Sequence, residues 1–351
     1  MSLRVAHPYL DTRVTLFAAH LLDRRQVAAA LGRPRDELRE LFRRCRAEPL
    51  LATGDEAQRR STEQRRLSLL LDDVVVLSRA LTGRSREFLL YWTHLFELIN
   101  LKAIVRGRLS GQDPRAIRTQ LLDMGPFSKL PVDDLLRAEN ENEMLRRLEN
   151  TAYAEIASQA RRVMEQQRDL FFVDTTFDRR FYSGLVKRAE ALHSHDPEAM
   201  RRMLTALIDG TNLTWLLRYR FVYRLPAAEA YFLLIPSGYR LRAGTLGALA
   251  SKDGTAAVLA ALPAPLDALT RGLTTIEEVN ARMARWLRRE CEWVLRRSRS
   301  AFCRAFAHLI LRERDLRILR GIVKGEELGV SLATQRQALR LREPDEEAPG
   351  V

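Results

Sequence analysis

The residues best suited to chemistry in this 351-residue chain are carboxylates and amides that recur at one spacing. Glu97 is followed three residues later by Asn100, and Asp209 by Asn212. Their oxygens could bind a metal ion, and paired carboxylates could act as general acid and base. A helix Asn at a repeated position more often bonds a backbone carbonyl where helices cross. We therefore expect structural roles, with the acids paired to nearby arginines.

Sequence motifs of several common enzyme classes are missing. Residues 247–252 lack the second Gly of a phosphate loop and the Ser or Thr after Lys252. The sequence contains no HExxH and no nucleophile elbow around a serine. His193 and His195 are a close pair, but we expect them at a helix end rather than on a metal. We predict no catalytic, cofactor-binding or metal-binding residues, and no independent enzyme.

The acids and amides belong to a segment that occurs three times, at residues 97–107, 209–219 and 315–325. Each copy has an acid, two spacers, Asn or Ile, a Leu, two spacers, two aliphatic residues and a cation. The acids are Glu97, Asp209 and Asp315; the next positions hold Asn100, Asn212 and Ile318, then Leu101, Leu213 and Leu319; the cations are Arg106, Arg218 and Lys324. On a helix the Leu and the aliphatic residue three positions on share one face, and the cation suits the negative helix end.

A Gly or Pro break and a further short helical stretch follow each copy, which favours a true repeat over chance similarity among Leu- and Arg-rich helices. Repeats of this length indicate a domain unit used three times. We predict helical repeat domains at residues 1–124, 125–237 and 238–345, with a frayed acidic tail at 346–351. The predicted fold is all-α, because no alternating pattern of strand length is present.

Local signals place some helix boundaries. Asp23 should cap a helix that begins at Arg24, and Pro197 should open another after Asp196. Asp174 should cap a new helix after the apolar residues 171–173. Residues 238–265, rich in Gly and Pro, should be the least helical part.

Charge and cysteine content limit the partners and the compartment. The net charge of +13 calls for an acidic partner, which could be nucleic acid, anionic lipid headgroups or an acidic protein. Cys45, Cys291 and Cys303 have no CxxC spacing, which favours a reducing compartment without disulfides or a zinc site. We find no signal-peptide pattern and no apolar run near 18 residues. The sequence predicts a protein that is cytoplasmic or sits on a membrane without crossing it.

Four segments in order resemble the C subunit of bacterial and archaeal V-type (A-type) ATPases and ATP synthases, which is related to the d subunit of eukaryotic V-ATPases. The matching segments are residues 9–14 with 21–22, 97–107, 209–218 with 234–239, and 313–325. The chain departs from the family pattern at three positions. Ile318 replaces the usual Asn, Glu97 an Asp, and Ser237 a Gly.

The resemblance implies a funnel of three pseudo-equivalent helical-bundle domains around a pseudo-three-fold axis, with a central cavity. It implies a non-catalytic central-stalk subunit, one copy per complex, on the cytoplasmic face of the membrane proteolipid ring. The shaft subunits D and F would insert into the cavity, and anionic lipid headgroups could touch the protein. Torque would pass between the ATP-hydrolysing head and the ring, which translocates H⁺ or Na⁺.

Two interpretations of the repeat cations remain open. Arg106, Arg218 and Lys324 could line the central cavity, or they could only neutralise helix C-termini. The alternative to a rotary subunit is a basic helical protein that binds nucleic acid or acts as a scaffold, although the sequence has no RNP-like or helix-turn-helix pattern. We expect no nucleic-acid partner.

Overall fold

The computed structural model describes residues 8–52, 56–167, 170–192 and 196–339. Within these ranges the secondary structure is helical and contains no strand, which confirms the all-α prediction. The chain divides into two compact units. Unit 1 consists of residues 1–81 and 291–351, and unit 2 of residues 82–290.

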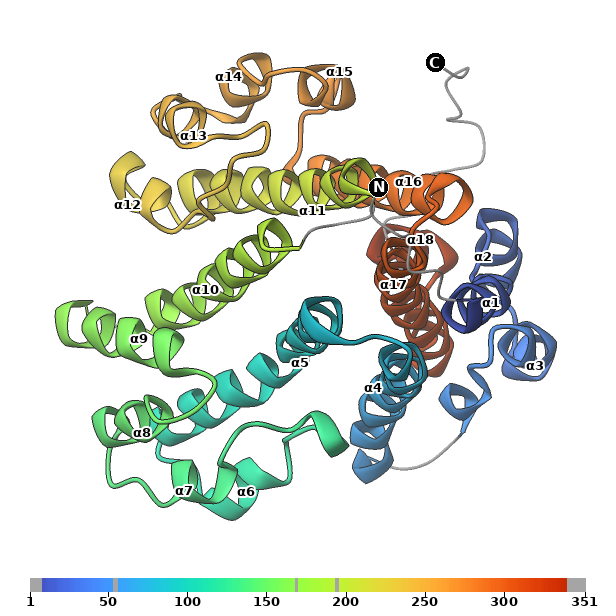
Figure 1. Ribbon diagram of the computed structural model, residues 1–351, viewed down its shortest axis with the longest axis horizontal. Helices are drawn as coiled ribbons and strands as arrows, with labels where there is room; N and C mark the ends of the chain where they lie inside the picture. The colour runs from blue at the N-terminus through green and yellow to red at the C-terminus, as the bar shows by residue number, and fades with distance from the viewer. Residues whose placement is uncertain (1–7, 53–55, 168–169, 193–195, 340–351) are drawn as a thin grey trace. The chain divides into compact units, whose positions relative to one another are not determined.

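Unit 1 combines the start and the end of the described chain. Its helices are α1 (Pro8–Ala18), α2 (Arg24–Ala30), α3 (Arg35–Arg44), the short 3₁₀ helix Glu48–Leu51, α4 (Glu56–Arg79), α17 (Ala301–Glu327) and α18 (Leu332–Ala338). The third motif copy lies on α17, which packs against both α1 and α4 (Figure 1). The two ends of the chain therefore build one core.

Unit 2 contains the first two motif copies, on α5 and α11. Its helices are α5 (Gly83–Leu109), α6 (Pro114–Arg118), the 3₁₀ turn Gly125–Phe127, α7 (Val132–Leu136), α8 (Glu141–Leu148), α9 (Ala154–Gln167), α10 (Leu170–Glu190), α11 (Pro197–Leu217), the π-helical turn Arg218–Val222, α12 (Ala227–Phe232), α13 (Ala243–Ala250), α14 (Thr255–Ala260), α15 (Leu266–Thr270) and α16 (Ile276–Arg297), which runs past the unit boundary. Helix α5 packs against α10, and α10 against α9.

Capping residues set several boundaries as the sequence predicts. The Asp23 side chain accepts a hydrogen bond from the Gln26 backbone N–H, and the Gln26 side-chain oxygen accepts one from the Asp23 backbone N–H, so α2 begins with a capping box. Asp196 accepts from the backbone N–H of Ala199, with Pro197 in the first turn of α11. Both predicted starts are confirmed.

Two local predictions are wrong. Asp174 does not cap a helix, because α10 already begins at Leu170 in the described chain and runs through this position. Residues 238–265 are not the least helical part; α13 and α14 lie inside them.

Helix α5 is the central helix of the larger core in unit 2. Its Leu98, Leu101 and Ile104 are buried in one cluster with Phe177 and Phe181 of α10. By length and composition α5 could cross a membrane, as no other helix of the described chain could, so the expectation that no segment approaches such a span was too strict. In the structure 67% of its most apolar window is buried, as in the core helix of a globular unit.

Two predicted features lie outside the described residues: the histidine pair His193 and His195, and the tail at 346–351. The boundaries of the three repeat domains remain predictions.

Candidate functional site

In the first motif copy, the repeat acid holds a loop by its backbone. Glu97 is 1% exposed, and its Oε1 accepts hydrogen bonds from the backbone N–H groups of Lys129 at 2.5 Å and Leu130 at 2.8 Å. The Ser128 hydroxyl donates to the same oxygen at 3.2 Å, and the buried Tyr153 hydroxyl donates to Oε2. We call a buried repeat carboxylate of this kind, together with the backbone N–H groups that donate hydrogen bonds to it, a clasp.

The second copy repeats this arrangement with fewer donors. Asp209 is fully buried and accepts from the backbone N–H of Arg240 at 2.9 Å and of Leu241 at 3.2 Å. Burial raises the pKa of this carboxyl to about 6, although the two backbone hydrogen bonds and Arg240 oppose the shift. Desolvation therefore disfavours the ionised form of the Asp209 carboxylate in this clasp.

In the third copy, the clasp joins the end of the chain to its beginning. Asp315 is 1% exposed and its Oδ2 accepts from the backbone N–H of Leu22 at 2.8 Å. The three clasped leucines, Leu22, Leu130 and Leu241, are all buried. Each stands two residues before a helix start, at Arg24, Val132 and Ala243. The acids thus fix equivalent points of the fold.

The amides one turn later hold a second loop. Asn100 donates to the carbonyl of Leu122 at 2.7 Å and accepts from its N–H at 2.8 Å. Asn212 makes the same pair of bonds to Ile235, at 3.0 and 2.8 Å. The predicted bond to a backbone carbonyl is confirmed, but the partner is a loop that follows a short helix rather than a crossing helix.

Ile318 takes this position in the third copy and is half-buried. The chain position equivalent to Leu122 is near residue 340, outside the described residues.

The prediction that the repeat acids pair with arginines is wrong for Glu97 and Asp209, which accept from backbone N–H groups instead. Loop residues carry no sequence signal for such bonds, since any residue except proline supplies an N–H. The repeat leucines Leu101, Leu213 and Leu319 are fully buried, as their place on the apolar face requires.

The three repeat cations lie near the ends of their helices, each with a local partner. Arg106 is 3.6 Å from Asp174, the Arg218 guanidinium donates to the Tyr223 hydroxyl at 3.1 Å, and Lys324 is 3.6 Å from Glu327. Such exposed or half-exposed contacts contribute little stability. Both interpretations of these cations stay open.

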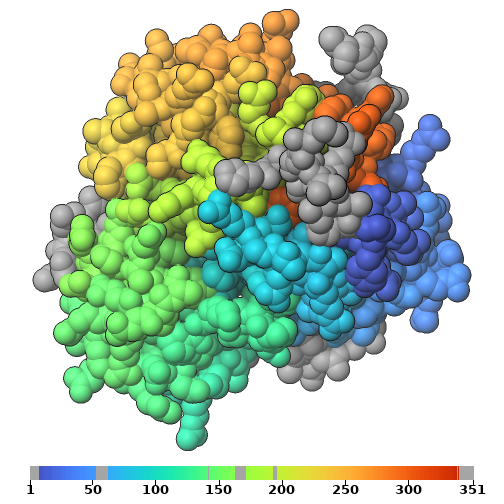
Figure 2. Space-filling view, viewed as in Figure 1, coloured from blue at the N-terminus to red at the C-terminus, as the bar shows by residue number. Residues whose placement is uncertain are grey.

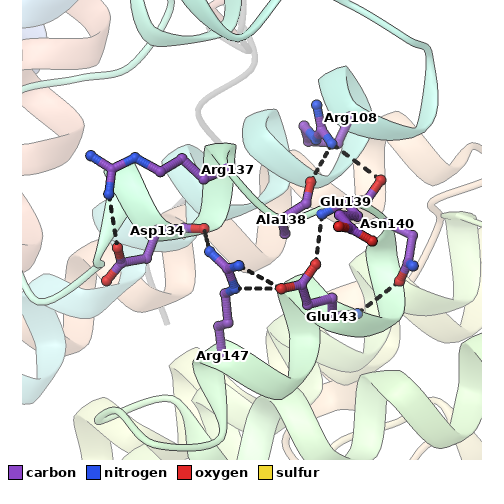
Figure 3. A network of polar contacts seen from close by, with 8 residues as sticks. All are labelled: Arg108, Asp134, Arg137, Ala138, Glu139, Asn140, Glu143 and Arg147. Carbon is purple, nitrogen blue, oxygen red and sulfur yellow. Dashed lines mark hydrogen bonds and ion pairs between the residues drawn. The ribbon is translucent and has the colours of Figure 1, made fainter.

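Arginines beyond the motif cap the short helices next to the first clasp (Figure 3). Arg108, near the end of α5, donates to the carbonyl of Ala138 just after α7. Arg147 of α8 donates to the carbonyl of Asp134 at 2.5 Å and pairs with Glu143. These bonds satisfy carbonyls at the end of α7, which has no further turn to pair with them.

The last position of the motif distinguishes the copies, since it holds Gly107, Tyr219 and Gly325. From the sequence we assigned no role to this position. A Cβ added to Gly107 would lie 2.6 Å from Ile117, and one on Gly325 would lie 2.8 Å from Gln335. Glycine here lets the next short helix approach α5 and α17 closely. The second copy has a buried Tyr219 instead, and its helix ends in the π-helical turn.

Unit 1 contains a buried ionic cluster that also has no counterpart in the motif. Asp73 of α4 is 3.1 Å from His308 and 3.3 Å from Arg312, both on α17. Arg312 also donates to the backbone carbonyls of Cys45 at 2.6 Å and Arg46 at 2.9 Å. A sequence-based signal existed, because His308 and Arg312 are four residues apart on one helix face.

Throughout the described ranges, no group of three or more His, Cys, Asp or Glu side chains is placed to hold a metal ion. The repeat carboxylates and amides bond to backbone groups, and Glu97 also accepts from the hydroxyls of Ser128 and Tyr153. The site is a set of buried clasps that hold loops to three long helices, with exposed or half-exposed cations at the helix ends.

Comparison with known proteins identifies the family. The ATP synthase (C/AC39) subunit family matches residues 10–337. The chain belongs to this family. The C subunit of the A-type ATP synthase of Halobacterium salinarum is 26% identical over 257 residues, covering 71% of this chain and 72% of the relative. The corresponding Pyrococcus horikoshii protein is 26% identical over 191 residues, 54% of this chain and 50% of the relative. Membership implies association with a membrane complex.

Proposed function

We propose that this chain is the non-catalytic central-stalk subunit of a rotary V-type ATPase or ATP synthase. It connects the shaft subunits D and F to the membrane proteolipid ring, on the cytoplasmic face, with one copy per complex. It passes torque between ATP hydrolysis or synthesis and the translocation of H⁺ or Na⁺. Family membership supports the complex, and the names of the archaeal relatives support the place of the C subunit within it.

The observation that carries the mechanical role is the repeated clasp. Torque transfer needs a body that does not deform between its two faces. A loop held by a buried carboxylate, and in two copies by an amide as well, can move only by leaving buried polar groups unpaired, which costs about 1–3 kcal/mol for each group. Glu97, Asp209 and Asp315 provide this stiffness at equivalent places.

We further propose three pseudo-equivalent domains around a pseudo-three-fold axis, forming a funnel with a central cavity. The equivalent clasps favour a division that differs from the predicted domains at residues 1–124, 125–237 and 238–345: each domain would begin with its motif helix. The N-terminal helices then complete the third domain, because the third clasp is bonded to Leu22. On this view Arg106, Arg218 and Lys324 hold equivalent places and face the shaft across the cavity. Anionic lipid headgroups near the ring would suit the basic balance of the chain.

A binding experiment tests this function. The protein is incubated with the purified D and F pair and, separately, with the detergent-solubilised proteolipid ring, without nucleotide. We expect binding to both. Binding to neither, with salt-sensitive capture of DNA or RNA, would overturn the proposal in favour of the basic nucleic-acid-binding protein.

The cavity assignment has its own test. Reversing two repeat charges, as R106E/R218E, should weaken binding to the D and F pair at least tenfold. The matched control is R39E/R43E, two arginines of α3 that are also highly exposed. If R106E/R218E and R39E/R43E are both folded and bind the D and F pair equally well, the cavity assignment is wrong and the repeat cations only neutralise helix ends.

A further inference from the structure

Exposed large apolar side chains concentrate just after two of the motif helices. Among the described residues they are Val222, Tyr223, Tyr231 and Phe232 after α11, Leu328 and Leu332 after α17, and Tyr9, Leu16 and Ile99 elsewhere. The corresponding segment after α5, residues 110–120, has none of them. Three equivalent places therefore have three different surfaces, and the one after α11 is the most aromatic.

The π-helical turn explains why this place differs. Tyr219 stands where the other copies have glycine, so the close approach made after α5 and α17 is replaced by an aromatic contact. The Tyr219 ring lies 5.8 Å from Phe171 and 6.1 Å from Trp215. The extra residue in the π turn then carries Val222 and Tyr223 outward, 57% and 44% exposed. π-helical turns are found frequently at functional sites.

The exposed aromatic side chains are held in place rather than loose. Tyr223 accepts a hydrogen bond from Arg218 at 3.1 Å, and its ring lies 4.7 Å from Phe171. The guanidinium of Arg179 lies 5.2 Å from the Phe232 ring and is fixed by a bond to the Leu234 carbonyl at 2.9 Å. Preorganised aromatic anchors lose little entropy on binding and are typical of protein interfaces. A fluid lipid surface would not require such order.

The segment that carries these side chains has a positive net charge. Residues 218–232 contain Arg218, Arg220 and Arg224 against the single acid Glu229, a net charge of +2. Arg218 and Arg224 are exposed. Arg220 is turned inward, to the carbonyls of Ala250 and Leu225. The segment around α12 reaches the surface in Figure 2, where it is yellow.

We propose that Val222, Tyr223, Tyr231 and Phe232, flanked by Arg218 and Arg224, form a docking surface for an acidic, partly apolar protein segment. We call this surface the aromatic corner. The inference rests on the proposed function, because the rotary complex supplies the partner. The apolar side chains of the corner would anchor the segment, and the two arginines would pair with acidic side chains beside the anchors.

The closing experiment compares Y231S/F232S with wild type in binding to the D and F pair and to the detergent-solubilised ring. Y9S/L16S is the matched control, since Tyr9 and Leu16 are 51% and 53% exposed but belong to unit 1. We expect Y231S/F232S to weaken binding to one of the two partners at least tenfold, and Y9S/L16S to change it less than twofold. R218E/R224E should weaken the same binding most at low salt.

The other outcomes separate the two proposals. If wild type binds and Y231S/F232S binds equally well, the aromatic corner is overturned while the proposed function stands. If wild type binds neither partner, both are overturned. If only phosphatidylglycerol vesicles distinguish Y231S/F232S from wild type, the surface is a lipid contact and the inference fails.

A second measurement keeps a large aromatic side chain at position 232 and uses the assembled complex. A photo-reactive benzoylphenylalanine at position 232 of the assembled complex should crosslink to an acidic peptide of another protein in that complex. Crosslinks to lipid alone, or none, would contradict the proposal.

Discussion

The first and second motif copies place the same kinds of side chain at the same positions, yet they build different surroundings. Glu97 accepts from two backbone N–H groups and from Ser128 and Tyr153, whereas Asp209 accepts from two backbone N–H groups in the described part of the chain. The first helix ends at a close glycine contact, and the second ends in an aromatic π turn. The repeat thus preserves the clasp itself, while the number of donors and the surface beyond it vary.

Removing each carboxylate in turn should produce the largest difference in stability between the two copies. Glu97→Ala leaves four donors without their acceptor and should cost about 4 kcal/mol, against about 2 kcal/mol for Asp209→Ala, whose charge is already opposed by burial. Urea unfolding at pH 7 measures both. Hydrogen exchange at Leu130 and Leu241 reports whether each loss is local. A larger loss in Asp209→Ala would contradict the comparison.

Removing the amides should change stability by amounts that differ less, and here the second copy should lose more than the first. Asn212→Ala leaves the N–H and carbonyl of the buried Ile235 unpaired and should cost about 3 kcal/mol. Asn100→Ala should cost about 2 kcal/mol, because Leu122 is half-buried and water can replace the amide. Urea unfolding of both variants checks the order. Equal losses would mean that exposure of the partner loop is unimportant.

The second clasp should respond to pH. The pKa of Asp209 is raised from 3.8 to about 6, so the folded protein binds this proton more tightly than the unfolded chain. Its contribution to stability is fully present below pH 3.8 and is lost as pH rises through 6, a change of roughly 2–3 kcal/mol.

The measurement is the difference in unfolding free energy between wild type and Asp209→Asn from pH 4 to 7, in which other titrating groups cancel. The wild-type protein should lose stability relative to the variant as pH rises. A flat difference would show that the two backbone bonds hold the pKa at its ordinary value.

The smallest expected effect concerns the glycine contact. Gly107→Ala places a methyl group 2.6 Å from Ile117 and should cost about 1–2 kcal/mol, which Ile117→Ala should partly relieve in the double variant. Gly247→Ala is the matched control: Gly247 is also inside a helix, but its nearest neighbour would be at 3.9 Å, so alanine should be neutral or stabilising. Thermal unfolding of Gly107→Ala, Ile117→Ala, the double variant and Gly247→Ala measures these differences.

Much of the fold could be predicted because its signals are local. The cap at Asp23, the start at Pro197 and the buried leucines of the motif follow from spacing along one helix. Asp174 misled us because an acid after an apolar run resembles a cap, whereas the buried Val173 continues the core face of α10.

The site was predictable only in part, for a physical reason. The sequence marked Glu97, Asp209 and Asp315 as repeated, but their partners are backbone N–H groups about 30 residues later or at the other end of the chain. Backbone groups are the same in every residue, so nothing in the sequence identifies them. Tyr219 could have been noticed, since it interrupts a glycine shared by the other two copies.

The bond between Leu22 and Asp315 spans 293 residues and has a consequence for biosynthesis. A ribosome delivers α1 to α4 before unit 2 and α17 after it, so unit 1 has no complete core until α17 has been made. Residues 82–290, by contrast, leave the ribosome as one uninterrupted stretch and can fold during synthesis. Throughout that time Leu10, Val14 and Phe17 of α1 lack the helix that covers them in the finished protein. The nascent chain therefore carries the buried face of α1 without its α17 partner while the whole second unit is made.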